Sequence, residues 1–517
     1  MTSDGLGPPE RLHPLYLVTG LGKALRGAWG LVAGTAVFVA QGRWWLAAAL
    51  GIGFLILSVG SLLVKWLKLE YRVGADELRI DSGFLNRTSR AIPFDRVTDV
   101  DLEQGPLHRL FGLARVRLET GASAGASKED GVLDAIALGR AAALRDHIRS
   151  RRGTITAPVV DQVEPPPIFA MDRRRVATAG LFNFSLAMLA GLFGITQTLG
   201  NVIGFDPFRR TFWVDLLSRS EPARDLMLAH QYLAAVAGSI LLVLVGSATG
   251  IVRTALREHG FRLDHIETGL RRRRGLATLT DVTIPARRVQ AAIIGSGPVR
   301  RTFGWCALKL QSLAMDGAKG DHVVAPLARP DEAAAILAAL GWPESPDQDQ
   351  WRPLSRGYFT SAATLFTGLG AIALVASWLV GPLALVGLPL LAIAALTRWL
   401  EWRHARYALS GEILFVENGW WRQKRVILPA AKVQSAQLNE SFWTRAFGFC
   451  TLQLGVAGGG GFSAHGVPAL SRADGENLRR QLLSSDHFGR APAVANSPHS
   501  IRPYDDPPDA ALGRFNP

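Results

Sequence analysis

Long apolar runs constrain this chain more than any other feature of its sequence. Between residues 27 and 64 the only charged residue is Arg43, and the run 357–397 contains no charged residue at all. A helix crosses the roughly 30 Å hydrocarbon core of a bilayer in about 20 residues, so each run is long enough for two spans. Each run therefore predicts a pair of transmembrane helices, which turn near Gly42 in the first run and at Gly381-Pro382 in the second.

A third pair is predicted between these two runs. Apolar sequence extends from residue 176 to about 204 and from 226 to 252, with a polar loop at 206–225 between the two stretches. The mean hydropathy of the chain is +0.16, although its charged residues, which make up 19%, are crowded between the apolar stretches. We therefore expect six transmembrane helices.

Lysine and arginine residues gather at one end of every predicted pair. They are Lys23, Arg26, Lys65, Lys68, Arg173, Arg174, Arg175, Arg253, Arg257, Arg352, Arg356, Arg398 and Arg403. The opposite ends carry Arg43 and, in the central loop, Arg209, Arg210, Arg219 and Arg224. Because an excess of basic residues in short loops marks the cytoplasmic side, both termini and the segments between the pairs are predicted to be cytoplasmic.

Three segments between and after the pairs repeat one pattern, at residues 71–120, 261–312 and 407–456. In each, a Phe-Gly pair begins 18 residues after a proline that follows an apolar residue. The prolines are Pro93, Pro285 and Pro429, and the Phe-Gly pairs begin at Phe111, Phe303 and Phe447. Basic residues recur three positions after the proline, at Arg96, Arg288 and Lys432, and two before the phenylalanine, at Arg109, Arg301 and Arg445. Such agreement indicates an internal repeat.

The repeated segments are typical of antiparallel β structure. Apolar residues alternate with polar ones at 97–102 and 452–454, and helix-like stretches follow at 138–151, 329–340 and 471–483. The two cysteines, Cys306 and Cys450, both lie 21 residues after their proline, where the first segment has Ala114. This exchange predicts a small buried strand position rather than a redox or metal site.

The order of paired spans and repeats resembles the YdbT-like bacterial membrane proteins, whose cytoplasmic modules are bacterial pleckstrin-homology (PH) domains. The resemblance rests on Ile-Pro-Phe-Asp-Arg-Val at 92–97, on Arg-Leu-Phe-Gly-Leu-Ala at 109–114, and on the two echoes of each. It implies a membrane α + β fold, with six transmembrane helices in three pairs alternating with three PH-like barrels of about seven strands, each closed by a C-terminal helix. It also implies a multi-pass protein of the bacterial inner membrane, and a smaller single-repeat membrane relative as partner.

These observations divide the chain into ten parts. We expect an N-terminal cytoplasmic segment at 1–22, transmembrane pairs at 23–68, 173–256 and 355–402, PH-like domains at 69–152, 257–341 and 403–484, linkers at 153–172 and 342–354, and a disordered tail at 485–517.

Motifs for nucleotide or zinc chemistry are missing from the sequence, which contains no GxxxxGK[ST] and no HExxH. Its one GxSxG match, at 121–125, lies in a Gly-, Ala- and Ser-rich stretch and not at a turn from an apolar strand into a helix, so it does not indicate a nucleophile elbow. We therefore predict no catalytic residue, no cofactor, no metal and no enzyme. The net charge of +14 fits cytoplasmic flanks and an anionic membrane surface better than nucleic acid.

The basic residues of the repeat are candidates for contact with anionic lipid headgroups or with a partner. The densest group is Arg271, Arg272, Arg273 and Arg274, and the others are the six repeated residues named above. A basic residue near an anionic surface contributes about 1 kcal/mol. The alternative is that they are solvated charges that only enforce topology.

Binding is therefore the predicted function. We expect a non-enzymatic membrane scaffold or envelope-stress component whose PH-like modules bind partner proteins, one another or anionic lipid. The alternative is an export or resistance transporter for lipophilic or peptide toxins. Transport usually leaves polar or interrupted helices near the midplane, and these spans contain almost none.

Overall fold

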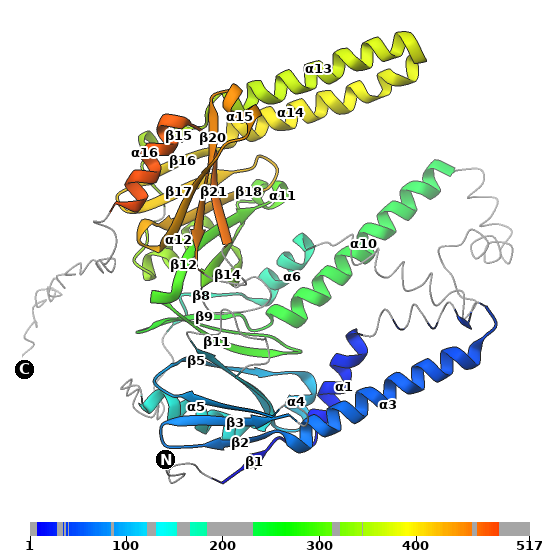
Figure 1. Cartoon of the computed structure of the whole chain (residues 1–517), viewed down its shortest axis with the longest axis vertical. Coiled ribbons are helices and arrows are strands. Elements are labelled where there is room, and N and C mark those ends of the chain that lie inside the picture. Colours follow the sequence, from blue (N-terminus) through cyan, green and yellow to red (C-terminus); the bar gives the residue numbers. More distant parts are fainter. Residues whose placement is uncertain are drawn as a thin grey trace, which may run out of the picture.

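The computed structural model describes residues 8–27, 31, 35, 38–39, 41–83, 87–120, 131–151, 166–183, 231–312, 321–343, 345–457 and 463–484. Three β-rich units are stacked along the long axis of the molecule, and long helices leave the stack on one side (Figure 1).

The three units have the same order of elements. Unit 1 comprises β1 (Glu10–Arg11), β2 (Glu70–Val73), β3 (Glu77–Ser82), β4 (Thr88–Pro93), β5 (Val97–Gln104), α4 (Pro106–Leu110), β6 (Leu113–Thr120), β7 (Val132–Ala137) and α5 (Leu138–Arg151). Unit 2 comprises β8 (Phe169–Ala170), β9 (Arg262–Ile266), β10 (Gly269–Arg274), β11 (Leu279–Pro285), β12 (Val289–Ser296), α11 (Pro298–Thr302), β13 (Cys306–Ser312), β14 (Asp321–Ala328) and α12 (Pro330–Ala339). Unit 3 comprises β15 (Arg352–Pro353), β16 (Arg406–Ser410), β17 (Ile413–Asn418), β18 (Gln423–Pro429), β19 (Val433–Asn439), α15 (Phe442–Ala446), β20 (Phe449–Val456), β21 (Ser463–Ser471) and α16 (Arg472–Leu483).

The seven strands of a unit do not close into a barrel, so the prediction of three closed barrels is wrong. The strands form four sheets, in the orders β1-β2-β3-β4, β7-β6-β5-β11-β10-β9-β8, β14-β13-β12-β18-β17-β16-β15 and β19-β20-β21. In every unit the chain leaves one sheet at the repeated proline, which cannot donate to a ladder, and enters another. The edge strands β5 and β12 are then paired by β11 and β18 of the next unit, which satisfies the edges that closure would have satisfied.

Both junctions between units use one register. Gln104 lies opposite Leu279, and Ser296 lies opposite Gln423. In each pair the first residue lies 11 positions after the proline of its own unit, and the second lies six positions before the proline of the next unit. The units are therefore joined by one repeated interface.

The junction between units 2 and 3 is also a hydrophobic core. Ala408, Phe415 and Ile427 of unit 3 are wholly buried in the same cluster as Ala292 and Leu308 of unit 2. Removal of this apolar surface from water stabilises the pairing of the strands.

A buried histidine makes the same junction sensitive to pH. His465 Nε2 donates to Gln311 Oε1 across the two units at 2.6 Å, and burial, with Lys424 nearby, lowers the pKa of His465 from 6.5 to about 4. The unfolded chain takes up this proton below pH 6.5, but the folded junction does so only near pH 4. Stability should therefore be complete above pH 6.5 and fall by up to about 3 kcal/mol as the pH drops to 4.

The difference between wild type and His465→Gln isolates this contribution, because glutamine keeps a hydrogen-bonding amide and does not titrate. Denaturant unfolding of both proteins in detergent micelles between pH 4 and 7.5 measures it. Parallel pH profiles for the two proteins would contradict the assignment.

Four segments of the described chain are long and apolar enough to cross a membrane. They are Trp44–Lys68 (helix α3), Ile240–Glu258 within α10 (Gln231–Glu258), Gly357–Leu379 within α13 (Gly357–Val380), and Leu385–His404, which includes α14 (Leu388–His404). The turns expected at Gly42 and Gly381 are confirmed, since both residues have positive φ, +74° and +114°. The two other expected spans fall mostly outside the described residues, as do the loop 206–225 and the tail 485–517.

Each unit holds both ends of the chain segment that contains its long helix or helices. The short strands β1, β8 and β15 come before that segment, and each pairs with the first strand after it, as Arg352 pairs with Tyr407. Residues in the expected linkers 153–172 and 342–354 thus supply strands to units 2 and 3. Helix α6 (Arg173–Phe182) packs on α10 so closely that a Cβ on Gly250 would lie 2.6 Å from the Gly180 carbonyl oxygen.

Candidate membrane-proximal site

The short helices α4, α11 and α15, each ending at a Phe-Gly pair, lie on the side of the stack from which the long helices leave (Figure 1). The glycines of these pairs, Gly112, Gly304 and Gly448, have φ of +63°, +70° and +69°. Glycine adopts this left-handed conformation without steric cost. The repeated Phe-Gly pair is therefore the C-terminal stop of each short helix.

Two of the short helices, α11 and α15, pack against the helices α6 and α13. Phe182 at the end of α6 lies 6.2 Å, centroid to centroid, from Phe303 beside α11. Helix α13 begins at Gly357, where an added Cβ would lie 2.3 Å from the Phe447 carbonyl oxygen. These two short helices are thus fixed beside α6 and beside the start of α13.

Large apolar side chains are exposed on or beside the short helices. They are Leu107, Leu110, Phe111, Val299, Phe303, Phe442 and Trp443, with Phe442 87% exposed. Arginines lie among them, and burial lowers the pKa of Arg300, which donates to Asn183 Oδ1 at 2.9 Å. Apolar and aromatic groups next to basic ones are typical of surfaces at the membrane interface.

The arginine two positions before each Phe-Gly pair has a distinct role in the first two units. Arg109 Nη1 donates to the Leu276 carbonyl oxygen at 2.6 Å, and Arg301 Nη1 donates to the Trp420 carbonyl oxygen at 3.3 Å. Both acceptors lie in the next unit, nine residues before its proline. These predicted binding residues therefore connect consecutive units. Arg445, their equivalent in unit 3, is 69% exposed and lies 3.6 Å from Glu440.

The four consecutive arginines lie on strand β10 and have protein partners. Arg271 forms a two-pronged ion pair with Asp281, and Arg273 contacts Asp264 at 3.2 Å. The wholly buried Arg272 donates to the Val323 carbonyl oxygen at 3.0 Å, and Arg274 is in a buried pair with Glu258. Alternation along the strand explains the two environments. Contact of this run with lipid stays a prediction, and the guanidinium groups of Arg272 and Arg274 are not at the surface.

The basic residues three positions after the prolines are not equivalent in space. Arg288 is 8% exposed, whereas Arg96 is exposed. Lys432 donates from Nζ to the Arg287 carbonyl oxygen at 2.9 Å, and burial lowers its pKa. Lys432 thus adds a contact between units 2 and 3, and binding of a lipid or partner by Arg96 stays a prediction.

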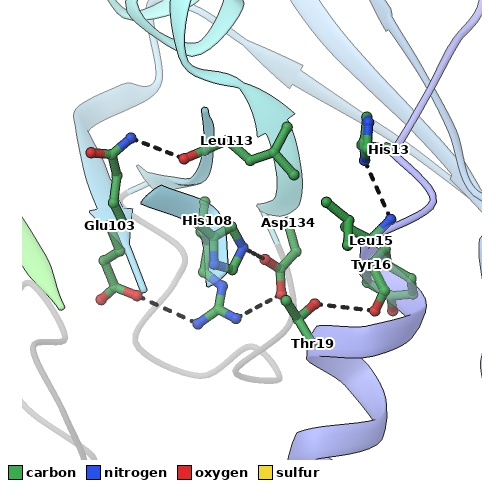
Figure 2. Close-up of polar contacts among 10 residues, drawn as sticks. His13, Leu15, Tyr16, Thr19, Glu103, His108, Leu113 and Asp134 are labelled. Carbon is green, nitrogen blue, oxygen red and sulfur yellow. Dashed lines mark hydrogen bonds and ion pairs between the residues drawn. The ribbon is translucent and has the colours of Figure 1, made fainter. Parts of the chain in front are cut away.

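Unit 1 contains a buried polar cluster that sequence reasoning missed (Figure 2). His108 Nε2 lies 2.9 Å from Asp134 Oδ1, and Arg115 Nη2 donates to Asp134 Oδ2 at 2.6 Å. Glu103 is a second, longer partner of Arg115 at 3.5 Å. Burial opposes the charged form of Arg115, but the hydrogen bonds and negative charges of Asp134 and Glu103 together outweigh it and raise the pKa of Arg115. The repeat did not predict this cluster, because Arg300 and Thr444 stand at the position of His108 in the other two units. The cluster fixes α4 to β6 and β7.

The cysteines confirm the sequence interpretation of their position. Cys306, Cys450 and Ala114 are buried on equivalent strands, and burial raises the pKa of Cys306 to about 11. The thiols are therefore protonated at neutral pH. Within the described ranges, no group of three His, Cys, Asp or Glu side chains is placed to hold a metal ion.

Comparison with known proteins confirms both the repeat and the resemblance. The model of the bacterial PH domain family matches residues 17–152, 223–341 and 362–486. The chain is 22% identical, over 440 residues, to the UPF0699 transmembrane protein YdbT of Bacillus subtilis (strain 168), covering 80% of this chain and 84% of that one. It is 32% identical, over 84 residues, to the UPF0699 transmembrane protein YdbS of the same organism, covering 16% of this chain and 53% of YdbS. No solved structure matches. With three matches that together span most of its length, this membrane chain belongs to the bacterial PH domain family.

Proposed function

We propose that this protein is a non-enzymatic scaffold of the bacterial inner membrane, in which a row of bacterial PH units holds membrane proteins at the cytoplasmic surface. The observation that carries the proposal is the pair of seven-stranded sheets that run across unit boundaries. At both junctions one unit offers its neighbour a strand edge and an arginine, and the junction of units 2 and 3 also buries apolar surface. These are features of a module that binds other modules of its own kind.

The short helices support a position of the row against the membrane. Exposed side chains on or beside them include Leu110, Phe303 and Phe442, and the short helices lie on the side of the stack from which the long helices leave (Figure 1). Such side chains enter the headgroup region, and the excess of basic residues attracts anionic lipid. The described long helices contain few polar groups, which favours anchoring over transport of a toxin.

Affinity capture of the full-length tagged chain from mildly solubilised membranes tests the scaffold. We expect stoichiometric recovery of another membrane protein, and a relative with a single PH unit is the partner that the pattern of similarity favours. The matched control is Arg480→Gln, an exposed residue of α16 on the other side of the stack, which should leave the recovery unchanged. Recovery of no partner, together with sensitivity of a deletion strain to lipophilic or peptide toxins, would replace the scaffold with an exporter.

A further inference from the structure

The row of units ends in two strand edges that complement one another. Among the described residues, β4 of unit 1 pairs only with β3, and β19 of unit 3 pairs only with β20. The equivalents of β4 are β11 and β18, and those of β19 are β5 and β12. Those four strands form the two junctions within the chain. Each end of the molecule therefore carries one half of an interface that the chain builds twice internally.

Exposure at the two ends shows the surface that a junction covers. Ala91 of β4 is exposed, whereas its equivalents Thr283 and Ile427 are 9% and 0% exposed. On the other strand, Ser435 of β19 is exposed, whereas its equivalent Ala291 is wholly buried. Unpaired edges of this kind are the usual sites of strand addition.

The register of the internal junctions brings complementary side chains of the two ends together. It would place Thr88 opposite Asn439 and Arg87 opposite Glu440, as Lys424 lies opposite Gly295 and Gln423 opposite Ser296. Arg87 is exposed, and Glu440 lies at the end of the open edge. Opposite charges that face each other across a strand pair favour the pairing.

Unit 3 also retains the arginine that makes this contact elsewhere. Arg109 and Arg301 each donate to a carbonyl oxygen of the following unit, and the described part of the chain contains no fourth unit that could supply such an acceptor to Arg445. Its side chain is 69% exposed. The open edge of unit 3 thus has the same binding group as the two occupied edges.

We propose that β19 of one copy of this chain pairs with β4 of a second copy, in the register of the internal junctions, so that copies join head to tail along the membrane. The inference rests on the unit–unit binding in the proposed function and names its surface. Both internal junctions keep the long helices on one side of the stack (Figure 1), so the same operation leaves the helices of the second copy on the membrane side. Because the two surfaces differ, the contact generates a row or a ring rather than a closed pair.

Disulfide cross-linking of full-length protein in isolated membranes tests the pairing. In a background of Cys306→Ala and Cys450→Ala, one tagged copy carries Thr88→Cys and a differently tagged copy carries Asn439→Cys. The pair Gly295→Cys and Lys424→Cys within one chain is the matched control, since it occupies the same register at an existing junction. An added Cβ on Gly295 meets no atom within 4 Å.

We expect a disulfide between the two copies only when both variants are present, and a ladder of larger products when one chain carries both substitutions. The out-of-register pair Thr88→Cys with Ser435→Cys should give about tenfold less product, because disulfide geometry tolerates little displacement. Formation of the Gly295–Lys424 control without any Thr88–Asn439 product would overturn the proposal. So would a product between two Asn439→Cys copies, or one that joins Asn439→Cys to a single-unit PH protein. Those last two outcomes leave the scaffold itself intact.

Discussion

Replacement of Arg274 by glutamine is expected to destabilise unit 2 by about 3 kcal/mol, because it removes the partner of a buried carboxylate. Arg274 Nη1 donates to both carboxylate oxygens of Glu258 at 3.0 Å, and the two side chains are only 9% and 6% exposed. Glu258 is the last residue of α10, so this pair joins a helix that is long and apolar enough to cross a membrane to strand β10. Arg257 also contacts Glu258, at 3.1 Å, which places the expected loss at the lower end for buried pairs.

Denaturant unfolding of the full chain in detergent micelles measures the loss of stability. A double replacement tests whether the loss comes from the unpaired carboxylate. Glu258→Leu with Arg274→Leu should recover most of the stability, because apolar residues of similar volume substitute well for a buried ion pair. Arg472→Gln breaks an exposed pair with Glu476 and should leave the free energy of unfolding close to that of the wild type, because water screens exposed pairs. Equal losses for Arg274→Gln and Arg472→Gln would show that the buried pair does not hold α10 to unit 2.

Replacement of Ile427 by alanine is expected to destabilise the junction of units 2 and 3 by about 2–5 kcal/mol. Ile427 is wholly buried on β18 and lies opposite Ala292 of unit 2. Truncation removes its apolar contacts and leaves a cavity in a core to which both units contribute. Unfolding of the full chain, followed by proteolysis between the units, measures the effect.

Two further variants make the result of that replacement specific to the junction. Ile427→Val removes one methylene and should cost about 0.5–1.5 kcal/mol. Ala91→Ser changes the equivalent position on the open edge of unit 1, where the side chain is exposed. It should change the free energy of unfolding by no more than about 0.5 kcal/mol. A loss for Ile427→Ala as small as that for Ala91→Ser would mean that the two units do not share a core.

Much of the fold could be predicted from the spacing of residues along the chain, because the physical constraints that set this spacing are local. A bilayer requires about 20 apolar residues per span, so the uncharged runs predicted α3, α13 and α14 together with their turns at Gly42 and Gly381. The invariant spacing from proline to Phe-Gly predicted three equivalent units, which the family model matches. The interpretation of Cys306 and Cys450 as small buried residues was correct for the same reason, since equivalent positions of a repeat share an environment.

The candidate site was predicted less completely, because the sequence shows where a charge stands in the chain but not what faces it. The four arginines that begin at Arg271 are consecutive in the sequence, yet on strand β10 their side chains point alternately to its two sides. Three of them form ion pairs there, with Asp264, Asp281 and Glu258. The cluster of His108 and Asp134 joins residues 26 positions apart and has no counterpart in the repeat.

By itself, the sequence determined the apolar helices, their turns and the three repeated units, all of which follow from composition and spacing along the chain. Only the tertiary structure decided how the units are joined. Strand alternation is the same in a closed barrel and in a sheet shared with a neighbour, because both bury one face of each strand and pair its edges. The partner of an edge strand is a long-range choice. It was made here by the break at each proline, by the buried surface around Ile427, and by the arginines that reach from one unit to the next.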